Sequence, residues 1–264
     1  MRETVIVRVF DFDDTLAHTD GTIRILHYEN GEPKDTLAWL EQFGITGKPG
    51  PLGSVEITTG SFREYTKATD ELISAGELRR QECGGFVRFV PTDVVDFSMT
   101  AKIRRPKVID STIAVAKQAF ARGDIIGVIT GRTGGESMTD IEGNEIKITN
   151  ATNIRRFMSK HGVPIALEDI HCVGSLPGGV PYNKAQAMRS GFIEKYSPDC
   201  VIFYDDDVLN LSSVGAIDQR IHCIDSREIG DGWGSPSSVV DAARVRRKRV
   251  SGWTRSLEQA GIIR

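Results

Sequence analysis

Three carboxylates and a threonine follow an apolar run near the start of the chain. They are Asp11, Asp13, Asp14 and Thr15. The residues before them, 4–10, are rich in Val and Ile apart from Arg8, a composition that favours a buried strand in the centre of a sheet. Carboxylates this close repel one another, and a divalent cation, most simply Mg²⁺, relieves that repulsion. The alternative interpretation of this segment is a solvated acidic turn.

Two later apolar runs also end in polar residues. Residues 124–129 lead into Thr130, and residues 201–204 lead into the triplet Asp205–Asp207. Lys184 stands between these two runs, at the expected start of a helix. Because the carboxyl ends of neighbouring parallel strands meet at one edge of a sheet, we expect these groups to lie together.

Such a set of groups suits phosphoryl transfer, which depends on positioning and on neutralising charge. A carboxylate can attack phosphorus and form an acyl phosphate. Magnesium and a lysine neutralise the phosphoryl oxygens, and a hydroxyl group orients one of them. A second carboxylate protonates the leaving group and then activates the water that releases phosphate.

The elements around these residues predict an α/β fold. Helices are expected between the strands, over Val108–Arg122, Thr152–His161 and Lys184–Tyr196, with a further short strand at Ile170–Val173. Regular alternation of strands and helices over residues 106–226 indicates a mainly parallel sheet with helices on both faces.

Residues 17–100 lack the regular alternation of strands and helices seen later in the chain. They are interpreted as an insertion, a cap or flap that folds over the main sheet. The run Thr22–Glu29 before Asn30-Gly31 predicts a hairpin, and Asp35–Phe43 predicts a short helix capped by Asp35. His18 and His27 are expected to be surface or flap residues. The domain prediction is therefore a catalytic core of residues 1–16 and 101–264, with 17–100 inserted; the core ends in a basic segment, residues 240–264.

Composition limits the partners of the chain. Its 264 residues allow one large domain or two smaller ones, and a net charge of −3 predicts no strong general attraction to nucleic acid or membranes. We expect a cytoplasmic protein, because no signal peptide or membrane span is visible and the four cysteines lack C-x-x-C spacing. The five histidines lack the spacing of a zinc site.

Four short segments, in order, resemble the motifs of the haloacid dehalogenase (HAD) superfamily of phosphatases. They are Phe10-Asp11-Phe12-Asp13-Asp14-Thr15-Leu16, Ile129-Thr130-Gly131-Arg132, Lys184 within Tyr182-Asn183-Lys184-Ala185, and Phe203-Tyr204-Asp205-Asp206. The resemblance covers residues 4–16 and about 106–226, and it implies a Rossmann-like core with a cap inserted after the first motif. Looser similarity points to HAD-like proteins of tailed bacteriophages and to the phosphatase half of polynucleotide kinase-phosphatases.

The resemblance implies roles for single residues. Asp11 would be the nucleophile and a magnesium ligand, and Asp13 the acid and base, which holds the metal through its backbone carbonyl. Asp206 would complete the metal site, with Asp205 behind it and Asp207 facing solvent. The groups that would bind the phosphoryl oxygens are Thr130, Gly131, Arg132 and Lys184.

The expected reaction is Mg²⁺-dependent hydrolysis of a phosphate monoester, because members of the family that cleave other bonds lack the second acid of the first motif. The expected substrate is a small or terminal phosphate monoester, and a nucleotide is the favoured case. A polynucleotide 3′-phosphatase of nucleic-acid repair is the alternative, since Arg104, Arg105, Arg132 and the basic run Arg244–Arg249 could follow a phosphate backbone. A phosphotransferase or mutase, or a protein that binds phosphate or nucleic acid without turnover, also stays open.

Overall fold

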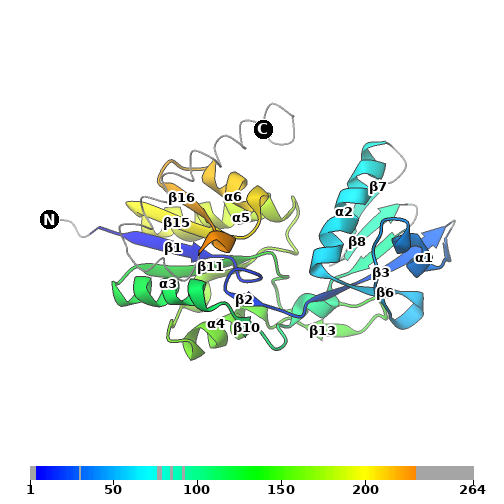
Figure 1. The fold of residues 1–264 in the computed structure, drawn as a ribbon, viewed down its shortest axis with the longest axis horizontal. Coiled ribbons are helices and arrows are strands. Elements are labelled where there is room, and N and C mark those ends of the chain that lie inside the picture. Colours follow the sequence, from blue (N-terminus) through cyan, green and yellow to red (C-terminus); the bar gives the residue numbers. More distant parts are fainter. Residues whose placement is uncertain (1–3, 30, 76–78, 84–85, 91–92, 230–264) are drawn as a thin grey trace. The chain divides into compact units, whose positions relative to one another are not determined.

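The computed structural model describes residues 4–29, 31–75, 79–83, 86–90 and 93–229 (Figure 1). The chain divides into two units. Unit 1 comprises Met1–Thr19, Pro106–Gly134 and Ala151–Arg264, and unit 2 comprises Asp20–Arg105 and Gly135–Asn150.

Unit 1 is an α/β structure built on a five-stranded parallel sheet, as the alternation of elements predicted. Its strands, in sheet order, are β14 (Ile170–Cys172), β11 (Ile125–Thr130), β1 (Ile6–Phe10), β15 (Cys200–Asp205) and β16 (Ile221–Asp225). The first strand of the chain is therefore the central strand of the sheet. Strands β11 and β14 lie on one side of β1, and β15 and β16, which come later in the chain, lie on the other.

Helices cover both faces of this sheet. They are α3 (Asp110–Ala121), α4 (Asn150–Lys160), α5 (Val180–Met188), which continues into a π-helical segment (Arg189–Glu194), and α6 (Val208–Gly215). Figure 1 shows α3 and α4 on one side of the strands and α5 and α6 on the other. On the second side, Val7 and Val9 of β1 pack in one apolar core with Met188, Phe192 and Leu211.

Smaller elements complete unit 1. Strand β2 (Ala17–His18) pairs antiparallel with β10 (Lys107–Val108). Single turns of 3₁₀-helix lie at Leu167–Asp169 and Ser226–Glu228.

Unit 2 contains an antiparallel sheet with two helices. The strands in sheet order are β5 (Lys48–Pro49), β6 (Val55–Thr58), β3 (Thr22–Glu29), β9 (Asp93–Asp96), β8 (Phe86–Val90) and β7 (Arg79–Cys83), with β4 (Glu32–Pro33) also paired to β3. The helices are α1 (Thr36–Glu41) and α2 (Thr59–Ser74), with 3₁₀ turns at Pro51–Gly53 and Ser98–Ala101. A separate hairpin joins β12 (Ser137–Thr139) to β13 (Glu145–Lys147).

The apolar core of unit 2 is its own. Ile23, Ile25 and Val95 of the sheet pack with Leu40 of α1 and Tyr65 of α2. As predicted, Asp35 caps α1: its carboxylate accepts hydrogen bonds from the backbone N–H groups of Leu37 and Ala38.

The boundaries of unit 2 differ from those expected for the insertion. Residues 17–19, which the sequence placed in the insertion, belong to unit 1, whereas residues 101–105 and 135–150, which it placed in the core, belong to unit 2. The reason is local packing: Met138 and Ile148 bury their side chains with Ala101, and the N–H of Thr149 donates to the carbonyl of Ala101. The hairpin of β12 and β13 thus joins the segment that precedes it by more than thirty residues.

One expectation about a single residue is wrong, and another holds only in part. Lys184 does not begin a helix: α5 starts at Val180, with Pro181 in the first turn where a missing N–H costs no hydrogen bond. His27, expected to be a surface or flap residue, lies in unit 2 but not at its surface: it is 3% exposed, because β3 is an interior strand of the unit 2 sheet.

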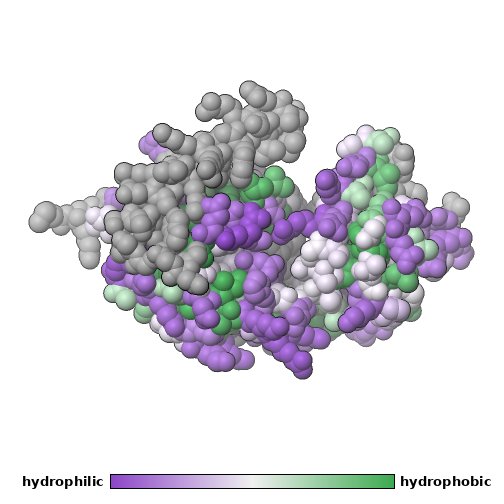
Figure 2. All heavy atoms as spheres, in the orientation of Figure 1, coloured by the Kyte–Doolittle hydropathy of each residue, from purple (hydrophilic) through white to green (hydrophobic). Residues whose placement is uncertain are grey.

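The described part of the chain has no helix that is both long and apolar enough to cross a membrane. Hydrophilic and intermediate residues occupy most of the described surface in view, with smaller hydrophobic areas (Figure 2). Within the described residues, the thiols of Cys172, Cys200 and Cys223 are not joined in disulfides. The basic run Arg244–Arg249 lies outside the described residues.

Candidate active site

Three neighbouring strands of unit 1 end in polar side chains at the same edge of the sheet. Asp11 follows β1, and its N–H continues the ladder by donating to the carbonyl of Tyr204 on β15 at 2.8 Å. Thr130 is the last residue of β11 and Asp205 the last of β15. Because strands are added on opposite sides of β1, this edge is a topological switch point, where open α/β sheets bind ligands.

Lys184 binds two of these carboxylates. Its Nζ lies 2.6 Å from Oδ1 of Asp11 and 2.7 Å from Oδ2 of Asp205, and all three side chains are buried. Helix α5 supplies the lysine because Asn183 anchors its first turn, donating from Nδ2 to the carbonyls of Val173 and Leu176. The sequence brings these groups from three separate segments, and the fold places them in direct contact.

Burial and neighbouring charges shift the pKa values of Asp11 and Lys184. Burial raises the pKa of Asp11 well above its ordinary value, and the neighbouring carboxylates of Asp205 and Asp13 add to that effect, while Lys184 opposes it. Burial by itself would lower the pKa of Lys184, but the two carboxylates outweigh it, so this pKa is raised. The lysine therefore carries its charge, and it offsets part of the repulsion between the acids.

Asp205 is held from several directions. Its Oδ1 accepts hydrogen bonds from the N–H of Asp207 at 2.9 Å and from Nδ2 of Asn210 at 3.1 Å, while its Oδ2 accepts from Lys184. Both oxygens thus contact the protein, which agrees with a supporting position for this residue. Asp207 caps α6, since its carboxylate accepts from the N–H of Leu209.

Asp11, Asp205 and Asp206 form a group that could hold a metal ion. One carboxylate oxygen of each lies within 4.8 Å of the others, and Asp206 is 9% exposed. Carboxylate oxygens are the ligands preferred by hard cations such as Mg²⁺, and a buried acidic group with one lysine retains net negative charge. The donor set therefore fits a divalent cation.

Arg132 and Thr19 bind the carboxylate of Asp13. Arg132 donates from Nε to Oδ2 at 2.9 Å and from Nη2 to Oδ1 at 2.7 Å, which makes a two-point contact. The hydroxyl of Thr19 also donates to Oδ1, and Nη2 of Arg132 contacts that hydroxyl at 2.7 Å. The hydroxyl of Thr130 lies 3.5 Å from Oδ2.

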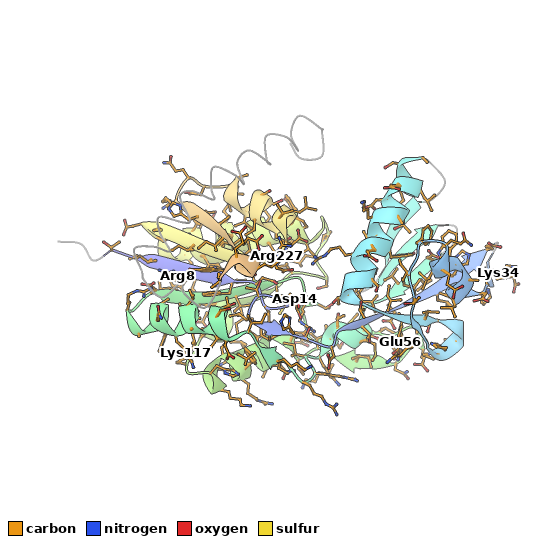
Figure 3. All side chains as sticks on the ribbon, in the orientation of Figure 1. Arg8, Asp14, Lys34, Glu56, Lys117 and Arg227 are labelled. Carbon is orange, nitrogen blue, oxygen red and sulfur yellow. The ribbon has the colours of Figure 1, made fainter. Side chains whose placement is uncertain are left out.

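The turn after β1 is stabilised by hydrogen bonds on both sides. Asp14 has a positive φ of 56°, a conformation that aspartate tolerates better than most residues, and its carboxylate pairs with His18. The buried hydroxyl of Thr15 bonds that of Ser226 at 3.0 Å. Figure 3 shows Arg8 along β1 and Asp14 at the turn beyond it.

The structure thus brings the expected residues together as two adjoining groups. One comprises Asp11, Asp205, Asp206 and Lys184, and the other comprises Asp13, Thr130 and Arg132. Gly131 lies between Thr130 and Arg132 in sequence. Its carbonyl lies so close to Gly174 that a side chain on Gly174 would collide with it. Sequence reasoning missed Thr19, Asn210 and Ser226, none of which stands in a distinctive motif.

A comparison with protein-family models found no matching family, and a comparison with curated proteins found no significant match. What this site does must therefore be inferred from the residues of the chain itself.

Proposed function

We propose that the chain is a Mg²⁺-dependent phosphatase of the haloacid dehalogenase type, which hydrolyses a phosphate monoester through an aspartyl-phosphate. The observation that carries the proposal is the direct contact of Lys184 with Asp11, 173 residues away. Asp13, Thr130 and Asp206 lie at or just after the ends of the same neighbouring strands.

In the first half of the reaction, a carboxylate oxygen of Asp11 attacks phosphorus and the bond from phosphorus to the leaving oxygen breaks. Asp13 donates a proton to that oxygen, so that an alcohol departs rather than an alkoxide. Lys184 and the hydroxyl of Thr130 neutralise and orient the phosphoryl oxygens.

In the second half, Asp13 removes a proton from water as the water oxygen attacks phosphorus. The bond from phosphorus to Asp11 breaks, phosphate leaves, and Asp11 is again a carboxylate. Asp11 and Asp206 would hold Mg²⁺, which when bound supplies positive charge beside the phosphoryl oxygens.

The order of strands supports the Rossmann-like core that this family would have. Most of unit 2 is inserted in the sequence after the first motif, where the family would have its cap. Both segments of unit 2 leave unit 1 shortly after residues of the site: Asp20 follows Asp13, and Gly135 follows Thr130. A cap that begins beside the catalytic residues would restrict access to them and contribute to the choice of substrate.

A phosphotransferase or mutase would use the same intermediate and differs only in the acceptor that attacks it. A protein that merely binds phosphate has no use for a nucleophile and an acid two residues apart, so the pair Asp11 and Asp13 favours turnover. The favoured substrate is a small phosphate monoester such as a nucleotide, since closure of a cap excludes bulky chains.

The test is hydrolysis of p-nitrophenyl phosphate, with Mg²⁺ and with excess chelator. We expect turnover only with Mg²⁺ and none with Asp11→Asn, because an amide is a poor nucleophile and a weaker ligand. Near-normal activity of Asp11→Asn would remove it as the nucleophile, and full activity in chelator would remove the metal. No turnover on a broad panel of phosphates would favour the binding alternative.

A further inference from the structure

Arg132 and Thr19 bind the carboxylate of Asp13, and neither side chain takes part in the steps proposed above. Arg132 contacts the carboxylate at two points, and Thr19 contacts both the carboxylate and the guanidinium. These three side chains form a closed triangle of hydrogen bonds within unit 1. Thr19 comes from the segment after β2, and Arg132 from the turn after β11, so two separate loops meet on one carboxylate.

Exposure separates the two groups of this contact. The side chain of Asp13 is 33% exposed, whereas that of Arg132 is 6% exposed. The carboxylate of Asp13 is therefore more accessible from solvent than the guanidinium of Arg132 is. The expectation that Arg132 binds a phosphoryl oxygen stays a prediction, and its contact with Asp13 is a second feature of the same side chain.

An aspartate side chain has two rotatable bonds, and proton transfer requires its oxygen within hydrogen-bond reach of the reacting group. The two-point contact with a planar guanidinium fixes the plane of the carboxylate as well as its position. The hydroxyl of Thr19 adds a third hydrogen bond, which limits rotation of the pair.

We propose that Arg132 and Thr19 are positioning residues that hold the carboxyl group of Asp13 in the orientation that proton transfer requires. This inference rests on the proposed phosphatase function. The step served is the one in which the bond from phosphorus to the leaving oxygen breaks and that oxygen takes a proton from Asp13; in hydrolysis of the intermediate, Asp13 takes a proton from water.

The test exploits the need of the leaving group for a proton. An alkyl phosphate must be protonated as it leaves, whereas the p-nitrophenolate of p-nitrophenyl phosphate is a stable anion. The measured quantity is kcat/KM, which covers the steps up to departure of the leaving group, for p-nitrophenyl phosphate and for a nucleoside monophosphate.

For Arg132→Met and Thr19→Val we expect a selective loss. The value for the alkyl ester should fall by up to about 10²–10⁴-fold, the usual contribution of general acid catalysis, and the value for the aryl ester far less. Inhibition by inorganic phosphate should change little. Thr19→Ser should keep kcat/KM for both esters near the wild-type values, since it retains the hydroxyl. Arg156→Met, which removes an exposed arginine of α4, should change neither value.

A double-mutant cycle makes the test specific. In the background of Asp13→Asn, the change Thr19→Val should cause little further loss, because the group that it positions is already disabled. Circular dichroism and thermal unfolding of each variant show whether it is folded.

Other outcomes would overturn the proposal. Equal losses for both esters, with weaker inhibition by phosphate, would make Arg132 a phosphate-binding residue. Unchanged rates in folded variants would leave the triangle a purely structural contact. If the wild-type protein hydrolysed neither ester, the proposed function would fail and the positioning role with it. If the wild type were active and Arg132→Met and Thr19→Val lost activity equally on both esters, only the positioning role would be refuted.

Discussion

At the scale of single residues, Lys184 compensates the buried carboxylates of Asp11 and Asp205. Buried charges are costly unless they are paired and hydrogen-bonded, and its ammonium group lies within 2.7 Å of both carboxylates. Removal of one partner from such a group leaves the others uncompensated, which is more destabilising than the absence of the whole group. The same lysine therefore serves stability and the proposed chemistry.

We expect Lys184→Met to lower the free energy of unfolding by about 3–5 kcal/mol, because it leaves two buried carboxylates without their cation. Urea unfolding at neutral pH with chelator measures the loss. Added Mg²⁺ should restore more stability to this variant than to the wild type, since it binds the folded carboxylates. The control is Lys117→Met on the exposed face of α3 (Figure 3), expected to change stability by no more than about 0.5 kcal/mol. Equal stability of both variants would refute this account of Lys184.

At the scale of elements, one buried carboxylate connects four elements of unit 2. Asp93 of β9 accepts hydrogen bonds from Nδ1 of His27 on β3, from Nε1 of Trp39 on α1 and from the hydroxyl of Tyr65 on α2. The rings of His27 and Trp39 are stacked, with centroids 4.3 Å apart. The network thus ties both helices of unit 2 to the middle of its sheet.

The pKa of His27 predicts how stability depends on pH. Burial alone would lower this pKa, but the hydrogen bond and charge of Asp93, with a smaller contribution from Glu29, raise it above its ordinary value. A raised pKa in the folded state stabilises the protein below the unfolded pKa of about 6.5, and this contribution is lost as pH rises through the folded pKa.

We therefore expect the free energy of unfolding to fall as pH rises above about 6.5, and His27→Gln to lack that part of the dependence. Urea unfolding at a series of pH values measures both proteins. An NMR titration of the His27 ring gives the pKa directly. A pKa below that of an unfolded histidine, or the same pH dependence in His27→Gln, would contradict the prediction.

At the scale of the whole molecule, charge bears on the choice between a small and a polymeric substrate. The net charge of −3 gives no general attraction to nucleic acid, although the exposed residues Lys102, Arg104, Arg105 and Lys107 form a basic stretch between the two units in sequence. Contacts between such residues and a phosphate backbone weaken steeply with salt. Salt dependence therefore separates the two substrate classes.

We expect kcat/KM for a nucleoside monophosphate to exceed that for a 3′-phosphorylated oligonucleotide and to change little between low and high salt. A preference for the oligonucleotide that falls about 10-fold or more from 50 to 200 mM salt would point to a polynucleotide substrate. Loss of that preference in Arg104→Ala/Arg105→Ala would place the contact in the stretch between the units. Its loss in Arg246→Ala/Arg247→Ala/Arg249→Ala would place the contact in the C-terminal basic run.

Local signals in the sequence determined the elements and the edge at which the candidate site lies. A β-branched run that ends in Asp11 predicted β1, the period of residues 108–122 predicted α3, and Asp35 predicted the start of α1. Each of these depends on neighbours in sequence, which set backbone preference and the side that is buried. The alternation of such elements was enough to predict a mainly parallel sheet.

The tertiary structure alone decided which polar groups meet. Arg8 interrupts an apolar strand, yet it is buried. Its guanidinium donates to Asp124, which directly precedes β11, and to the hydroxyl of Tyr204 on β15. The partners of Asp13, and the burial of His27, likewise depend on strand register and packing between distant segments. No spacing in the sequence encodes these contacts, since the free energy that makes them favourable arises only when the folded chain removes both partners from water.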